Sequence, residues 1–170
     1  MRSIAFCMVL TFWLGQLAVA DSGVLVWNID KDLETSYKTI YNTLEKNRFF
    51  VVFEPNIQGN LSSFAERWGE NYNRNKLEGI RAMVFCNIWY TNEISNADPD
   101  MLAMCPLHMT LIQQAGSTRV LFIRPTVVAA DSKALAIATE LEQDISKAMD
   151  EAVNELRGCP EACQKAGKSG

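Results

Sequence analysis

The densest group of ligand-type side chains in the sequence lies between residues 101 and 109. It contains the candidate metal ligands Met101, Met104, Cys105, His108 and Met109, and His108 is the single histidine of the chain. Thioether, thiolate and imidazole groups suit Cu(I) or an axial position on haem iron. In a strand that begins at Cys105, side chains alternate, so Cys105 and Met109 share one face and His108 points to the other. This alternation favours core packing, a common role of methionine, over a copper or haem site.

Four cysteines beyond the N-terminal segment form two candidate disulfide pairs. Cys159 and Cys163 are four residues apart, and in a helical turn this spacing brings their Cα atoms to about 6 Å, within reach of a disulfide. This pair predicts a local disulfide, with a thiol-redox pair as the alternative. Cys86 and Cys105 fall in segments that can lie on neighbouring strands, so a structural disulfide and two separate thiols are both open.

Enzymatic chemistry of the conventional hydrolytic kind has little support in the sequence. A single histidine is available as a base, and the G-x-S-x-G pattern of a nucleophile elbow is absent. The chain has 20 acidic and 16 basic residues and a formal net charge of −4. This balance disfavours nucleic acid as a partner, because phosphate binding requires clustered Lys and Arg.

The first twenty residues have the pattern of a secretory signal peptide. Arg2 gives a positive start, residues 4–14 are apolar, and Ala18-Val19-Ala20 offers small residues for cleavage after Ala20. The apolar run is shorter than the roughly 20 residues that span a bilayer. We therefore expect a periplasmic or secreted protein that is not inserted in the membrane after cleavage.

The rest of the sequence predicts one α+β domain over residues 21–157 and a polar, cysteine-containing tail over 158–170. Alternating and helical apolar patterns define its elements. They predict strands at 23–29, 48–53, 80–89, 107–112 and 118–123, an amphipathic helix at 33–44, a short helix capped by Asn60, an irregular or partly helical segment at 91–104, and a long helix from Asp131 or Ser132 to about Arg157. A late hairpin followed by a long helix favours an antiparallel sheet with helices packed on one face.

Four dipeptides give the chain a resemblance to the DUF302 domain family, as an exported bacterial member. They are Cys86-Asn87 at the end of an apolar strand, Asp98-Pro99 in a loop, Cys105-Pro106 at the start of a strand, and Arg124-Pro125 before the long helix. The resemblance covers residues 24–156. It implies an α+β fold with a curved antiparallel sheet and frequent dimers, and the family has no agreed biochemical role.

These observations lead to two functional expectations from different classes. The first is an exported, non-catalytic binding or interaction protein of the DUF302 type, self-associating as a homodimer and without a cofactor. The alternative is a periplasmic copper, haem-associated or thiol-redox protein that uses the Met101–Met109 stretch or the Cys159/Cys163 pair.

Overall fold

The computed structural model describes residues 22–158. The predicted signal peptide at 1–20, the cysteines Cys159 and Cys163, and the tail from 159 onward lie outside the described residues. Within residues 22–158, no helix combines the length and apolar composition that crossing a membrane requires.

Five strands form one antiparallel sheet in the spatial order β1-β5-β4-β3-β2. Their bounds are β1 Val24–Ile29, β2 Phe50–Phe53, β3 Gly79–Cys86, β4 Leu107–Gln114 and β5 Ser117–Ile123. A tight turn joins β4 to β5, and its two central residues, Ala115 and Gly116, both have positive φ. The first two strands in sequence, β1 and β2, are the two edges of the sheet.

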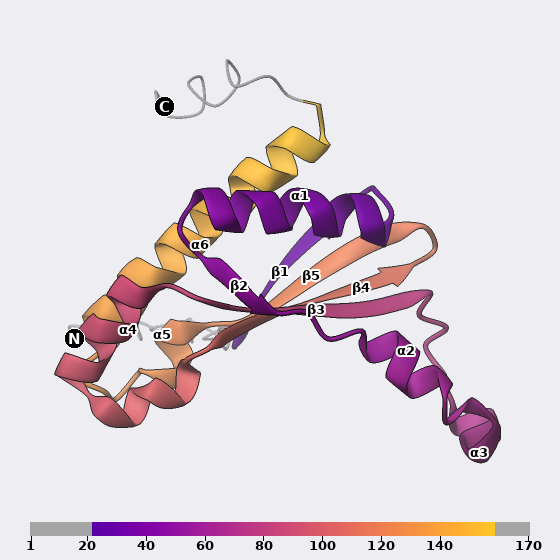
Figure 1. Cartoon of the computed structure of the whole chain (residues 1–170), viewed down its shortest axis with the longest axis horizontal. Coiled ribbons are helices and arrows are strands. Elements are labelled where there is room, and N and C mark those ends of the chain that lie inside the picture. The colour runs from indigo at the N-terminus through magenta and orange to yellow at the C-terminus, as the bar shows by residue number, and fades with distance from the viewer. Residues whose placement is uncertain (1–21, 159–170) are drawn as a thin grey trace, which may run out of the picture.

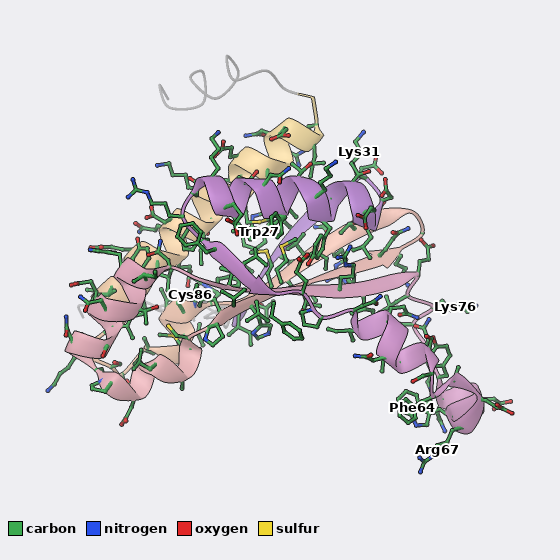
Figure 2. The ribbon with its side chains drawn as sticks, in the orientation of Figure 1. Trp27, Lys31, Phe64, Arg67, Lys76 and Cys86 are labelled. Atoms are coloured by element: carbon green, nitrogen blue, oxygen red, sulfur yellow. The ribbon has the colours of Figure 1, made fainter. Side chains whose placement is uncertain are left out.

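Helices cover one face of this sheet and flank its ends (Figure 1). Their bounds are α1 Leu33–Lys46, α2 Ile57–Ser62, α3 Ala65–Trp68, α4 Ile88–Ala97, α5 Pro125–Val128 and α6 Leu135–Leu156, with 3-10 segments η1 Gly69–Asn71 and η2 Pro99–Met104. The α2 and α3 segments extend away from the sheet on the side opposite α1, and Phe64 lies on this arm (Figure 2). The architecture is α+β, as the sequence predicts.

The hydrophobic core lies between the sheet and the pair α1 and α6. One face of α6 buries small and branched side chains, among them Ala138, Leu141 and Ile145. Alternate residues of the strands meet that face, for example Met109 and Leu111 of β4, which are fully buried. Asp32 caps α1 by accepting a hydrogen bond from the Thr35 backbone N–H at 2.9 Å. The covered face therefore follows from two apolar periodicities, 3.6 in the helices and 2 in the strands.

Three predicted element boundaries are wrong. The strand predicted at 80–89 ends at Cys86, because the Asn87 side chain accepts hydrogen bonds from the Trp89 and Tyr90 backbone N–H groups and starts α4. Asn56 rather than Asn60 caps the short helix, by accepting from the Gly59 N–H at 2.9 Å. The long helix begins at Leu135, later than Asp131 or Ser132.

Candidate functional site

The pairing between β4 and β5 stops before these two strands reach their ends. The last paired residues are Met109 and Phe122, whereas β4 stays paired with β3 as far as Leu107. Continuing the β4–β5 register would place Pro106 opposite Pro125. Neither proline has an N–H to donate, so a ladder cannot form there. The pairing has already ended at Met109 and Phe122, and the two prolines keep it from resuming at this end of the sheet.

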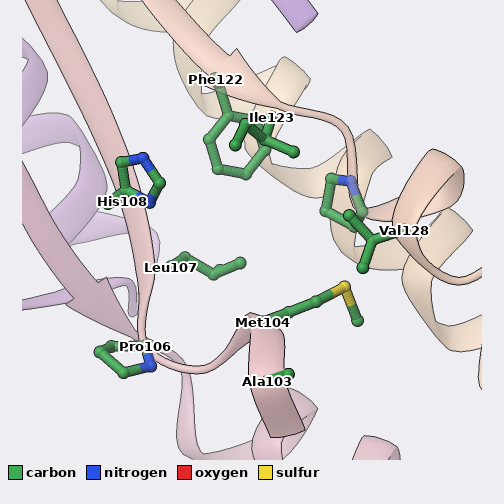
Figure 3. Close-up of a pocket in the computed structure, with 9 residues that line it drawn as sticks. Ala103, Met104, Pro106, Leu107, His108, Phe122, Ile123 and Val128 are labelled. Carbon is green, nitrogen blue, oxygen red and sulfur yellow. The ribbon is translucent and has the colours of Figure 1, made fainter. Parts of the chain in front are cut away.

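A hollow of about 170 Å³ occupies this split (Figure 3). Two stretches that are distant in sequence contribute its walls. One is η2 with the start of β4, and the other is the end of β5 with α5. Its lining residues are Ala103, Met104, Pro106, Leu107, His108, Phe122, Ile123, Pro125 and Val128. The floor is the core itself, because Leu107 and Phe122 are buried there. The rim includes the exposed side chains of His108, Ile123 and Val128.

A partly buried ion pair fixes the α5 wall of the hollow to the long helix. The Arg124 guanidinium donates to Glu142 Oε1 at 2.9 and 2.8 Å, and Thr126 donates to Glu142 Oε2 through its hydroxyl at 2.6 Å and its N–H at 3.1 Å. Burial alone would raise the pKa of Glu142, but the hydrogen bonds from Arg124 and Thr126 outweigh it and the pKa is lowered. The charged carboxylate therefore anchors α5 beside the hollow.

The η2 wall is held by a single carboxylate, Asp98. Its side chain accepts from the Asp100 N–H at 3.2 Å, which caps η2, and from the Ser132 hydroxyl at 2.6 Å, which ties η2 to the segment before α6. Pro99 follows at the first position of η2, where its missing N–H costs nothing. The Cys105–Pro106 peptide that joins η2 to β4 is cis.

The structure separates the five ligand-type residues of the 101–109 stretch. Met109 is buried in the core, and His108 lies on the opposite side of β4 and is exposed. Met101, Met104 and Cys105 pack against the core, and Met104 and His108 both line the hollow. Among the described residues, no three His, Cys, Asp or Glu side chains are grouped closely enough to hold a metal ion. The stretch therefore contributes one thioether and one imidazole to the lining of the hollow.

The two described cysteines, Cys86 and Cys105, are both free thiols of intermediate burial. Both contact the hydroxyl of Thr91 in the first half of α4, Cys86 Sγ at 3.2 Å and Cys105 Sγ at 3.9 Å. The strands bring these two thiols to the same end of the sheet, which sequence reasoning left open. The other predicted pair, Cys159 and Cys163, lies outside the described residues.

Most of the hollow was missed by sequence reasoning, which proposed only Met104 and His108 of its lining residues as site residues and noted Pro106 and Pro125 only in the family dipeptides. The α5 helix, which supplies Pro125 and Val128, has four residues and no helical periodicity to detect. One signal was available, because Arg124-Pro125 places a proline where a helix begins. Cys105-Pro106 is a second signal of this kind, because it places a proline directly before the start of β4.

Comparisons with known proteins agree with this architecture. Residues 26–152 match the family described as "Domain of unknown function DUF302". A solved structure, described as an uncharacterized conserved protein DUF302 from Bacillus stearothermophilus, superposes with a TM-score of 0.65 at 14% sequence identity. The superposition covers 76% of this chain and 98% of that one. No curated protein matches the sequence. Because the family match spans most of the sequence and the fold agrees, this chain belongs to the DUF302 family.

Proposed function

We propose that this protein is an exported, non-catalytic binding protein, and that the hollow between β4 and β5 is its ligand site. The observation that carries the proposal is the composition of the lining. Eight of the nine described lining residues have apolar side chains, and His108 supplies the one polar group at the rim. Concave sites with mostly apolar walls and few polar groups are typical of small-molecule and side-chain binding.

The volume of the hollow limits what it encloses. A cavity of roughly 150 Å³ lined by apolar side chains accommodates benzene, and this hollow measures about 170 Å³. We therefore expect a single ring or a branched apolar group, presented by a small molecule or by a partner's side chain. A porphyrin is several times larger, so the hollow as it stands favours a small apolar ligand over haem.

The absence of a catalytic partner for the histidine favours binding over catalysis. Among the described residues that line the hollow, His108 is the one with a side chain of the acid–base type. General acid–base and nucleophilic mechanisms need a second positioned group within hydrogen-bond reach. The imidazole suits a different task here, because it can orient one polar end of an otherwise apolar ligand.

An NMR titration with toluene tests the ligand site, and the signals of the single histidine are the readout. Because the chain has one histidine, its imidazole ring protons give one assignable set of NMR signals. We expect these signals to shift saturably with toluene, with a Kd on the order of 1 mM, typical of so small a ligand. Val128→Phe, which enlarges a lining side chain, is expected to weaken binding at least tenfold.

Val127→Phe is the matched control for that substitution. Val127 and Val128 are neighbours in α5 with similar exposure, 47% and 45%, but only Val128 lines the hollow. The control variant is expected to bind toluene as the natural sequence does. Equal effects of the two substitutions, or no shift of the His108 signals at any toluene concentration, would refute the ligand site.

We also propose that the chain self-associates through the uncovered side of β1 and β5. Val24 and Ile123 are directly opposed across these strands, and both are exposed, as is Val26. Exposed apolar side chains gathered on one face mark association surfaces. In sedimentation measurements, Val26→Lys is expected to yield monomer, whereas Val52→Lys on the opposite edge strand should leave a dimer. A dimer that survives Val26→Lys would exclude this surface.

The export part of the proposal rests on the first twenty residues and has its own test. Intact-mass measurement of the protein recovered outside the bacterial cytoplasm is expected to show a chain that begins at Asp21. Recovery of the chain there with residues 1–20 still attached would contradict cleavage after Ala20.

A further inference from the structure

The end of the sheet next to the hollow holds two thiols that the binding function does not use. Cys86 is the last residue of β3, and Cys105 lies between η2 and β4. β3 and β4 are antiparallel neighbours, paired up to Phe85 and Leu107. Two cysteines separated by α4 and η2 in the sequence are therefore brought to adjacent positions at one end of this strand pair.

A shared hydroxyl group shows how close the two sulfurs are. Thr91 Oγ1 lies 3.2 Å from Cys86 Sγ and 3.9 Å from Cys105 Sγ. The sulfurs are therefore no more than about 7 Å apart. Thr91 Oγ1 also donates to the Asn87 carbonyl at 3.0 Å. A disulfide requires the two sulfurs to approach to about 2 Å. Rotation about the Cα–Cβ bond is the side-chain movement that each cysteine has available for this approach.

The surroundings of the pair favour a disulfide that is stable once formed. Burial raises the pKa of Cys105, the Thr91 hydroxyl partly offsets this, and the negative charge of a Cys86 thiolate raises it further. A dithiol becomes a strong oxidant when its reduced form is stabilised. Here the net effect of the surroundings disfavours the Cys105 thiolate, which agrees with a resting disulfide in an oxidising compartment.

We propose that Cys86 and Cys105 are a dithiol–disulfide site, oxidised by exchange with an external disulfide. Cys86 reacts first, because it follows the buried Phe85 and strand alternation places it on the other face of the sheet, beside the exposed Phe50, whereas Cys105 packs against the core. The Cys86 thiolate attacks the external disulfide, forms a mixed disulfide and releases one thiol. The Cys105 thiolate then attacks the Cys86 sulfur and releases the second thiol.

This exchange is balanced in electrons and protons. The two protein thiols together give up two electrons and two protons, and the external disulfide takes them up to become two thiols. The bridge that results links the end of β3 to the residue that precedes β4, and so closes a covalent loop around α4 and η2. The proposal does not depend on whether the neighbouring hollow binds a ligand.

Peptide mapping of the full natural chain tests this site directly. Trypsin cuts after Arg81 and Arg119, and the fragment between them contains Cys86 and Cys105 and no other cysteine. The reduced protein is equilibrated with mixtures of reduced and oxidised glutathione, its free thiols are alkylated, and the fragment is weighed. We expect the fragment to have the mass of the reduced peptide minus two hydrogens, with neither glutathione nor the alkyl label attached to its cysteines.

A displaced cysteine provides the matched control. Val84 lies two residues before Cys86 on β3 and is opposed to His108, so the double variant Cys86→Ser, Val84→Cys keeps two thiols in the same fragment but moves one away from Cys105. At equal glutathione composition, we expect the natural pair to be bridged at least tenfold more than the displaced pair. Equal bridging, two stable glutathione adducts on the natural pair, or a bridge from either cysteine to Cys159 or Cys163 would overturn the proposal.

Discussion

The two sides of β4 differ in almost every physical respect. On one side, Met109 and Leu111 are fully buried beneath α1 and α6. On the other side, His108 is exposed at the rim of a hollow, although it is the immediate neighbour of Met109 in sequence. Strand alternation alone produces this contrast. A run of residues that looks like one chemical cluster in the sequence is therefore divided between a packed core and an accessible surface.

The largest expected effect tests the packed side. Met109→Ala removes a fully buried side chain and leaves a cavity, which typically costs about 2–5 kcal/mol in the free energy of unfolding. Denaturant unfolding followed by circular dichroism measures the loss. A loss below about 1 kcal/mol would mean that this side of β4 is not tightly packed. The two sides of β4 would then not differ in their contribution to stability.

The next effect concerns the link between the hollow and the covered side. Glu142→Gln removes the charge that accepts from Arg124 and Thr126, and we expect a loss of about 1.5–3 kcal/mol, the range for hydrogen bonds to charged groups. Glu140→Gln, an exposed position on the same helix, is the control and should change stability little. Equal losses in the two variants would show that the α5 anchor contributes nothing.

The Glu142 carboxylate also makes the free energy of unfolding depend on pH. The pKa of Glu142 is lowered in the folded protein, so the unfolded state binds its proton more readily. Its contribution is present above the unfolded pKa of about 4.3 and is lost as the pH falls through the folded value. Unfolding free energies measured from about pH 6 downward are expected to decline less steeply in Glu142→Gln than in the natural chain.

A smaller effect is expected from a close contact on the covered side. A Cβ added at Gly79 in β3 would lie 2.5 Å from Leu33 Cδ2, whereas one added at Gly23 meets nothing nearer than 3.8 Å. Gly79→Ala is therefore expected to cost about 1 kcal/mol, since the Leu33 side chain must shift. Gly23→Ala should be neutral within about 0.5 kcal/mol. Thermal unfolding of both variants makes the comparison.

The smallest effect belongs to the accessible side. His108→Ala is expected to change the free energy of unfolding by less than about 0.5 kcal/mol, because the imidazole is exposed. The same unfolding measurement as for Met109→Ala applies, so that two adjacent residues are compared under one condition. A loss similar to that of Met109→Ala would make His108 a packing residue rather than part of a binding site.

The sequence was most informative where a periodic pattern met a continuous element. The helix from Leu33 and the strands around 107–112 and 118–123 were predicted because their apolar residues recur at the helical or the strand period. The strand predicted to reach Trp89 was too long. The apolar residues continue past Asn87, but the strand conformation ends at Cys86 and α4 begins at Ile88. An asparagine that can cap a helix outweighed the apolar character of Ile88 and Trp89.

The hollow was beyond prediction for a different reason. Its walls come from residues around 104, 108, 122 and 128, and no local pattern relates these positions to one another. Their meeting depends on the β4–β5 hairpin, whose pairing ends at Met109 and Phe122 and leaves Pro106 and Pro125 on the two sides of the split. Each proline was visible in the sequence, but their placement on either side of one hollow is a property of the folded sheet. Alternation did separate His108 from Met109 correctly.

The place of β1 in the sheet has a consequence for the newly synthesised chain. β1 is the first strand to be made, and its sole neighbour in the sheet, β5, is the last. Pairing between segments so far apart closes a long loop, which slows folding. A chain interrupted before Ser117 holds the apolar β1 without its partner, whereas the β3–β4 pair can already form. Incomplete chains are therefore expected to expose β1 to proteases, whereas in the complete chain β1 is protected by its pairing with β5.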